Sequence, residues 1–163
     1  MNRLTFDSEA SVQGWAEIGD RVMGGVSHSV LRYDASGFAV FEGVLSLENG
    51  GGFASVRHSS LPLGGINISV YRLKVRGDGK RYKLNLGTSQ TFDAVQYQAG
   101  FAPEAGVWVD LEIPVTDFAA RFRGSTLTDS PPLDPSAVRQ IGLMVADRQA
   151  GPFRLEIFEI LCE

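Results

Sequence analysis

The chain has 163 residues, the length of one domain, and its 44% hydrophobic and 21% charged residues are typical of a globular protein rather than a disordered or fibrous one. A net charge of −4 provides no attraction for phosphate backbones or anionic lipid, which excludes nucleic acid as an expected partner. Cys162 is the only cysteine, so an intrachain disulfide and a thiolate metal cluster are excluded as well.

Apolar and polar residues alternate along most of the chain and are interrupted by glycine, a pattern that predicts antiparallel strands with one buried face. The expected strands, in chain order, are 2–7, 26–33, 38–48, 53–58, 66–76, 80–86, 95–101, 107–115, 140–146 and 152–161. In segment 38–48, Ala39, Phe41 and Leu45 share the apolar face, and Gly43 predicts a bulge or a close approach.

Segments 66–76 and 80–86 are joined by Gly77-Asp78-Gly79, which predicts a tight hairpin, because glycine adopts the positive φ that such turns require. This turn also accounts for the tripeptide R-G-D at 76–78, which we do not interpret as an adhesion motif. Segment 116–136 contains Pro131 and Pro132 and is expected to be a long connection with one short helical turn.

Many short strands with glycine-rich turns predict an all-β fold, an antiparallel jelly-roll β-sandwich, because one open sheet of so many strands would leave edges and a face uncovered. No linker or internal repeat divides the chain, so we expect a single domain over residues 1–163.

The sequence offers little for catalysis. His28 and His58 are the only side chains that act as bases near neutral pH, and the serines beside them on a strand point to the opposite face. Two histidines and one terminal cysteine do not favour a transition-metal site. We therefore expect neither an enzyme nor a cofactor or metal.

Strand 53–58 places Phe53, Ser55 and Arg57 on one face, and this arrangement has two interpretations. In the first, the three side chains form a binding surface. In the second, Arg57 pairs with a carboxylate and locks two loops together. The carboxylates that we nominate for such pairs are Asp20, Asp117 and Asp147, with Arg123 as a second guanidinium.

Three strings are distinctive together: D-R-V-M-G-G-V-S at 20–27, G-G-F-A-S-V-R at 51–57 and D-R-Q-A-G-P-F-R-L-E-I at 147–157. With Trp15, Trp108 and the segment around Arg123, they make the chain resemble the complex I intermediate-associated protein family, whose members are related to assembly factors of respiratory NADH:ubiquinone oxidoreductase. The resemblance extends over essentially the whole chain.

This resemblance implies a galactose-binding-like jelly roll, no catalytic activity, and a chaperone-like role in which the domain binds a protein partner during assembly. Complex I subunits or their assembly intermediates are the implied partners. The chain lacks a signal peptide and the long N-terminal extension of mitochondrial members, so we expect a bacterial, cytoplasmic protein that does not insert into membranes. The residues expected to bind the partner or ligand are Asp20, Met23, Gly24, Gly25, Ser27, Phe53, Ser55, Arg57, Trp108, Arg123, Asp147 and Gln149.

A second hypothesis stays open, since the implied fold is shared with sugar binders that use aromatic platforms on a concave sheet face. In this alternative the domain binds carbohydrate or another small ligand. The platform residues would be Tyr82, Tyr97 and Trp108, with Gln96 and Gln98 as hydrogen-bonding groups.

Overall fold

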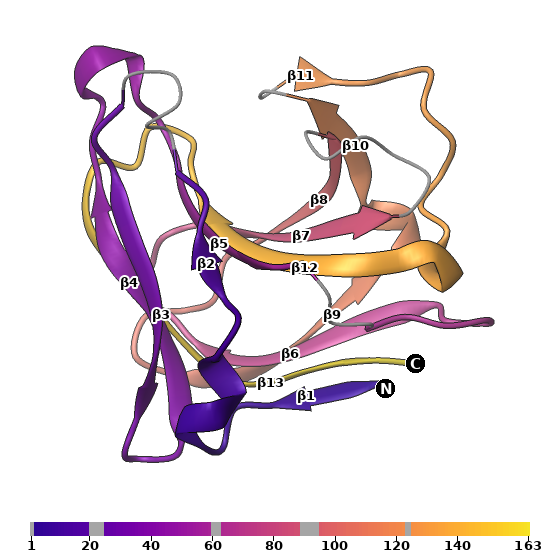
Figure 1. Cartoon of the computed structure of the whole chain (residues 1–163), viewed down its shortest axis with the longest axis horizontal. Helices are drawn as coiled ribbons and strands as arrows, with labels where there is room; N and C mark the ends of the chain where they lie inside the picture. The colour runs from indigo at the N-terminus through magenta and orange to yellow at the C-terminus, as the bar shows by residue number, and fades with distance from the viewer. Residues whose placement is uncertain (1, 20–24, 60–62, 89–94, 123–124) are drawn as a thin grey trace.

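Two antiparallel sheets pack face to face in the computed structural model (Figure 1), which describes residues 2–19, 25–59, 63–88, 95–122 and 125–163. The six-stranded sheet contains, in spatial order, β3 (His28–Asp34), β4 (Phe38–Leu45), β13 (Gly151–Cys162), β6 (Val70–Arg76) and β9 (Trp108–Pro114), with β1 (Arg3–Thr5) beside β13. The seven-stranded sheet contains β11 (Ser125–Thr126), β10 (Ala119–Phe122), β8 (Val95–Phe101), β7 (Tyr82–Thr88), β12 (Val138–Val145), β5 (Ala54–His58) and β2 (Ala16–Glu17). This architecture confirms the predicted all-β antiparallel jelly-roll sandwich.

Helical structure in the described residues is confined to short 3-10 turns between strands. These turns are η1 (Glu9–Val12), η3 (Glu48–Gly50), η4 (Val115–Asp117) and η5 (Pro135–Ala137). None of them has the length and apolar character that a membrane-spanning helix needs.

The core fills the space between the sheets with apolar residues from alternate strand positions. Phe41 on β4 and Tyr82 on β7 meet there from opposite sheets, with ring centroids 6.2 Å apart, and Phe153 on β13 packs on both rings. Burying one such side chain stabilises the fold by roughly 1.5–3 kcal/mol. Gly43 leaves space for the neighbouring strand, because a Cβ there would lie 1.9 Å from the carbonyl oxygen of His28. The close approach predicted at this glycine is thus confirmed.

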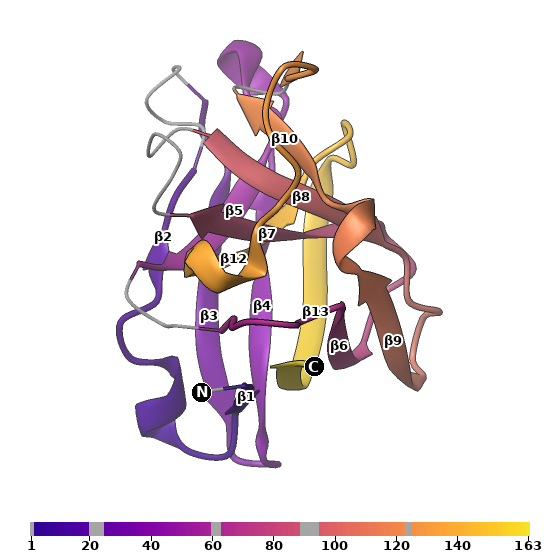
Figure 2. The same cartoon turned by 90° about the vertical axis from the view of Figure 1, so that its right-hand side faces the viewer.

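The ten predicted strands are all present, but the predicted hairpin between 66–76 and 80–86 is wrong. β6 pairs with β13 and β9 in one sheet, whereas β7 pairs with β12 and β8 in the other, so the turn crosses between the two layers (Figure 2). Alternation cannot distinguish these cases, because a hairpin and a sheet-crossing turn bury the same face of each strand.

Asp78 fixes this crossing. One carboxylate oxygen accepts hydrogen bonds from the Tyr82 hydroxyl at 2.9 Å and the Lys80 amide at 3.1 Å, and the other accepts from the Arg154 amide at 2.8 Å. Burial and the Asp78 charge together raise the pKa of Tyr82 above its ordinary value. The aspartate of the R-G-D string therefore serves the fold.

Three strands were not predicted. β2, β10 and β11 have two to four residues each, too short to show alternation, and the last two lie inside the expected connection 116–136. They extend the seven-stranded sheet at its two ends, with β10 paired to β8 and β2 paired to β5. These short strands therefore widen the outer face of the seven-stranded sheet.

Candidate binding face

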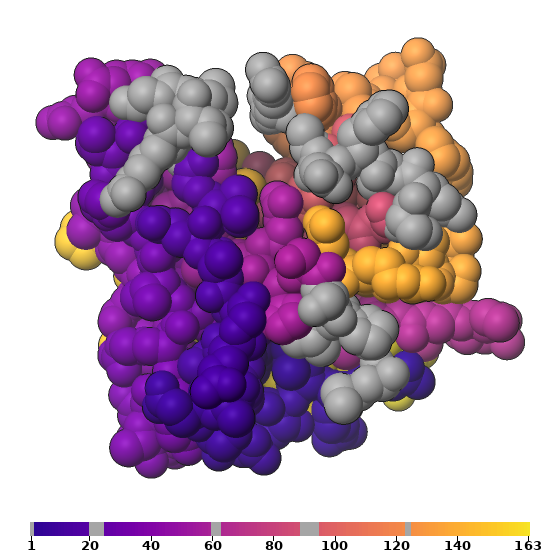
Figure 3. All heavy atoms as spheres, in the orientation of Figure 1, coloured from indigo at the N-terminus to yellow at the C-terminus, as the bar shows by residue number. Residues whose placement is uncertain are grey.

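The outer face of the seven-stranded sheet carries almost only polar side chains and glycine. Leu84, Leu86 and Leu143 point into the core, so the alternate positions on the same strands point outward. We call this surface the polar face; its strand residues are Ser55, Arg57, Lys83, Asn85, Gly87, Gln96, Gln98, Gly100, Ala119, Arg121, Gln140, Gly142 and Met144. β10 and β11 rise at one end and β4 with η3 at the other, and the surface is hollowed between them (Figures 1 and 3).

The strand register places one row of this face directly across the sheet. Gly142 lies opposite Arg57 on one side and Asn85 on the other, and Asn85 lies opposite Gln98. A side chain at 142 would have its Cβ 3.7 Å from the Cβ atoms of both Arg57 and Asn85 and 2.8 Å from the Val56 carbonyl oxygen. Glycine therefore leaves these two polar side chains room to stand beside each other.

Asn85 is the least satisfied polar side chain of the face. It is only 2% exposed, and its carbonyl oxygen Oδ1 is buried without a hydrogen-bond donor. Its amide nitrogen approaches the Met144 sulfur at 4.0 Å, and the Gln98 amide nitrogen approaches the same sulfur at 3.8 Å. A thioether is a weak acceptor, so both amide groups hold hydrogen-bonding capacity that the fold does not use well.

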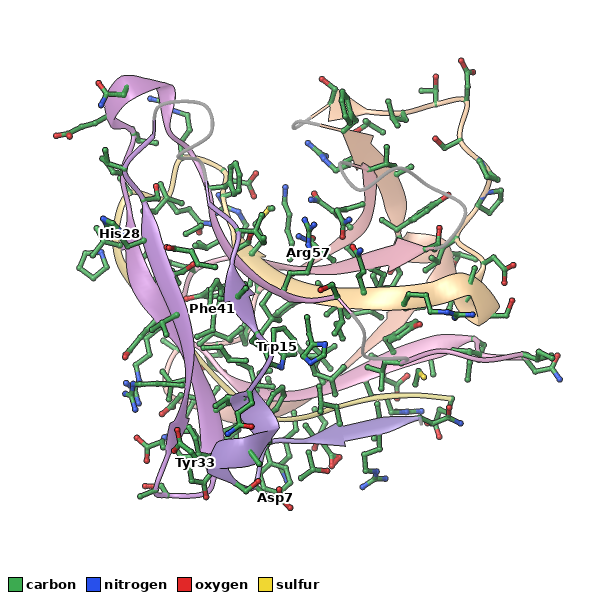
Figure 4. The ribbon with its side chains drawn as sticks, viewed as in Figure 1. Asp7, Trp15, His28, Tyr33, Phe41 and Arg57 are labelled. Atoms are coloured by element: carbon green, nitrogen blue, oxygen red, sulfur yellow. The ribbon has the colours of Figure 1, made fainter. Side chains whose placement is uncertain are left out.

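Cationic side chains surround this row. Lys83 lies two residues from Asn85 on the same strand, Arg57 lies on β5, and Arg121 lies on β10 opposite Gln96. The Lys83 ammonium is 3.6 Å from Asp147 at the margin of the sheet. Figure 4 shows Arg57 standing above β12, on the side of the sheet that β10 and β11 overhang.

The outer face of the six-stranded sheet is organised differently. Its charges form one continuous chain across β3, β4, β13 and β6, which we call the charge ladder: Arg32, Glu42, Arg154, Glu156 and Arg76. Arg32 approaches Glu42 at 2.6 Å, and Arg154 joins Glu42 at 3.2 Å to Glu156 at 2.9 Å. Every charge of the ladder has an opposite charge within the ladder.

Trp108 stands at the end of the charge ladder rather than on the polar face. The Arg76 guanidinium lies 5.0 Å from the centre of its ring, and Phe38 meets the ring edge-on at 5.4 Å. Such contacts stabilise an exposed site by roughly 0.5–1 kcal/mol each. Trp108 therefore has a packing role on the six-stranded sheet.

The prediction that Tyr82, Tyr97 and Trp108 form an aromatic platform for sugar binding is therefore wrong. Tyr82 and Tyr97 are 1% and 3% exposed and belong to the core, because the larger apolar member of each alternating pair faces inward. Gln96 and Gln98 do lie on the polar face. Among the strand residues of that face that the structure describes, none is aromatic.

Four of the predicted site residues, Asp20, Met23, Gly24 and Arg123, lie outside the described residues. Gly25 and Ser27 precede β3 and are both buried. The Ser27 hydroxyl accepts from the Ser46 amide at 2.9 Å and donates to the Ser46 carbonyl at 3.2 Å. Ser27 therefore ties the residues just before β3 to the chain after β4.

The second string contains residues that brace the fold and one charged residue on the polar face. Ser55 is 3% exposed, and its hydroxyl donates to the Ile18 carbonyl while its own carbonyl accepts from the Ser29 hydroxyl at 3.0 Å. Phe53 precedes β5 and is half-buried. Only Arg57 of this string reaches the polar face with a charged group.

The third string forms the turn between β12 and β13. Asp147 adopts a φ of 59° and pairs with Arg81 and with Lys83. The Gln149 side chain accepts from the Arg81 amide at 2.8 Å and donates to the Arg81 carbonyl at 2.9 Å. Gln149 thereby holds this turn against the chain before β7. Asp117, the remaining nominated carboxylate, is exposed in η4.

The two histidines do not meet. His28 lies on β3 and points away from the molecule (Figure 4), whereas His58 lies on β5 with its ring 6.0 Å from Trp15. Burial lowers the pKa of His58. Within the described parts of the chain, no three His, Cys, Asp or Glu side chains gather in a way that could hold a metal ion.

Comparison with known proteins assigns the family. The model of the family named Complex I intermediate-associated protein 30 matches residues 4–157. The chain belongs to this family. The resemblance predicted from the three strings is therefore confirmed, and so is the galactose-binding-like fold that it implied.

Solved structures of carbohydrate-binding modules are similar to this family member in fold. A family 11 module from Clostridium thermocellum, in complex with a β-1,3-1,4-mixed-linked tetrasaccharide, aligns with a TM-score of 0.68 and 16% identity over 99% of this chain and 96% of that one. A variant family 29 module complexed with mannohexaose aligns with a TM-score of 0.57 and 13% identity over 99% and 89%. At these identities the similarity establishes the fold alone.

Sequence reasoning missed the centre of the polar face. Asn85, Lys83 and Met144 were not proposed as site residues, although each alternates with buried leucines on its strand. The alternation shows that these side chains point away from the core. It does not show that they lie together, because the pairing of β7 with β12 is not visible in one sequence.

Proposed function

We propose that this chain is a non-catalytic binding module that holds a protein partner during assembly, with respiratory complex I subunits or their assembly intermediates as its partners. Membership of the complex I intermediate-associated protein 30 family supports this role. The observation that carries the proposal is the polar face, where the buried Asn85 carbonyl oxygen lacks a donor and the amide nitrogens of Asn85 and Gln98 both approach the Met144 sulfur.

Unused hydrogen-bonding groups favour a binding role over a structural one. A buried oxygen without a donor costs about 1–3 kcal/mol, a cost that is offset when a ligand supplies the missing donor. Protein surfaces present donors and acceptors side by side along the backbone and therefore suit such a face. The separation of His28 and His58 on different sheets supports a role without catalysis.

The proposal is tested by a tagged pull-down from the native host under mild crosslinking, with mass spectrometry of the recovered proteins. Lys83→Gln removes a charge from the polar face, and Lys74→Gln removes one from the other outer face as a matched control. We expect the wild type and Lys74→Gln to recover complex I subunits or intermediates and Lys83→Gln to recover several-fold less. Recovery of no specific protein by the wild type would contradict the proposed function.

Carbohydrate binding is the second candidate, supported by the shared fold and by Gln96 and Gln98 on a hollowed sheet face. Calorimetry with a mixed-linked glucan tetrasaccharide and with mannohexaose tests it. If this candidate holds, Gln98→Ala loses binding, whereas Trp108→Ala on the other sheet retains it. A wild-type protein that binds neither sugar ends this candidate.

A further inference from the structure

The Asn85 amide group offers a defined pair of complementary positions. Its oxygen lacks a donor, and its nitrogen points at the Met144 sulfur, a weak acceptor that a ligand oxygen can replace. Met144 is half-buried, and methionine side chains rearrange easily because they are unbranched. The N–H and C=O of one residue in an extended chain point to the same side, and such a pair satisfies both atoms of Asn85 at once.

The spacing along β7 extends this match. Lys83 and Asn85 are two residues apart on one strand and face the same side, about 6.8 Å from each other along the chain. An extended polypeptide has the same repeat. When the N–H and C=O of one of its residues pair with Asn85, a residue two positions away lies beside Lys83.

The charge of the face specifies that side chain. The described strand residues of the polar face include the cations Arg57, Lys83 and Arg121 and no carboxylate, and Asp147 lies only at the margin beside Lys83. The whole chain carries −4, so this positive surface opposes the overall charge. A ligand with a carboxylate complements such a surface and is guided to it.

Building on the function proposed above, we propose that the polar face binds an extended peptide segment of the partner that carries an acidic side chain. The Asn85 amide pairs with the main-chain N–H and C=O of one residue of that segment, and the carboxylate binds at Lys83. Gln98, which shares the Met144 sulfur with Asn85, donates to the next carbonyl along the segment. An acidic sugar would also complement the charge of these cations, but no described strand residue of the face supplies an aromatic ring for it to stack on.

The test is selection from a random dodecapeptide display library on the immobilised full-length protein, with the same selection on three variants. Asn85→Leu removes the amide, Lys83→Gln removes the cation, and Lys74→Gln is the matched control on the other outer face. Enriched peptides are then synthesised with a fluorescent label and titrated at low and high salt. Oligogalacturonate serves as the competing acidic sugar.

We expect peptides enriched in Asp and Glu, bound by the wild type and Lys74→Gln alike, with affinity about tenfold lower for Asn85→Leu and Lys83→Gln and lower at high salt. Enrichment of basic or purely apolar peptides would overturn the proposal. So would affinities unchanged in both polar-face variants, enrichment of no peptide above background, or binding of oligogalacturonate without binding of any peptide.

Each failure can be separated from failure of the proposed function. If the pull-down recovers complex I subunits but the selection fails as described, the chain is an assembly module that binds its partner by other chemistry. If the wild type recovers no partner, the proposed function fails whatever the selection yields. Thermal unfolding of Asn85→Leu, expected at or above the wild-type temperature, shows that its loss of binding does not come from unfolding.

Discussion

Arg154 on one outer face donates to two carboxylates, whereas Asn85 on the opposite face keeps a buried oxygen that no group donates to. The same sandwich thus carries one face whose charges pair with one another and one whose centre holds a buried oxygen without a donor. A charge ladder stabilises a sheet surface without a ligand, while unsatisfied amides cost stability until something binds. The difference supports our proposal that the seven-stranded sheet presents the binding site, whereas the charge ladder of the six-stranded sheet stabilises the fold.

Removing Glu156, the centre of the charge ladder, should have the largest effect on the free energy of unfolding. Glu156 is buried and accepts from both Arg76 and Arg154, so Glu156→Ala removes the carboxylate that Arg76 contacts and leaves Arg154 with Glu42 alone. We expect the free energy of unfolding to fall by about 2–3 kcal/mol, with partner recovery unchanged at a temperature where the variant is folded. Urea unfolding measures the loss. Glu112→Ala, which breaks an exposed pair with Arg72, is the control and should cost less than about 1 kcal/mol.

Asn85→Leu should change the free energy of unfolding in the opposite direction, or leave it unchanged. It replaces a buried group that lacks a donor with an apolar side chain of similar size, so we expect stability to be unchanged or raised by up to about 1 kcal/mol while partner binding is lost. Urea unfolding and the pull-down check the two halves. A stability loss larger than about 1 kcal/mol would mean that Asn85 supports the fold, and the contrast between the two faces would then disappear.

Acid should affect the charge ladder through Glu156. Burial favours the neutral carboxyl, but the hydrogen bonds from Arg76 and Arg154 outweigh this effect and hold the pKa of Glu156 below its ordinary value of 4.5. Its charged form therefore contributes stability that is present above pH 4.5 and is lost as pH falls through the lower folded-state pKa. The free energy of unfolding from urea titrations between pH 6 and pH 3 should decline less steeply in Glu156→Gln than in the wild type. Equal slopes in both proteins would show that the ladder is not coupled to folding.

Titration of His58 should have the smallest effect on the free energy of unfolding. Because burial lowers its folded-state pKa, the unfolded chain takes up a proton first, and stability decreases as pH falls below about 6.5 towards that lower value. We expect a loss of a few tenths of a kcal/mol, absent in His58→Gln and retained in His28→Gln, a change on the exposed strand β3. Chemical denaturation at pH 7.5 and pH 5.5 measures it, and a pH effect that persists in His58→Gln would assign it to another group.

Much of the fold was predictable because strand period and turn composition are local properties. Segments such as 107–115 alternate so regularly that the inward row, with Ile113 in the core, follows from the sequence. The partner of each strand is not local, and the crossing at Asp78 was therefore predicted as a hairpin. The short strands β10 and β11 were missed because two to four residues cannot display a period.

The candidate site was predictable only in part. Arg57, Gln96 and Gln98 were identified, because polar residues inside strands are visible in sequence. The bracing roles of Ser27 and Gln149 depend on backbone groups distant in the chain, and no sequence pattern indicates them. The roles of Asp20, Met23, Gly24 and Arg123, together with the cytoplasmic location, stay predictions.

The most direct test of the account replaces Gln98 with a photoreactive phenylalanine derivative and, in a second protein, replaces Glu112 on the outer face of β9 in the same way. Both proteins are irradiated in the native host, and the crosslinked partners are identified by mass spectrometry. We predict complex I subunits or assembly intermediates crosslinked through position 98 and not through position 112. Crosslinks through position 112 alone, or equally through both, would contradict the assignment of the seven-stranded sheet as the binding face.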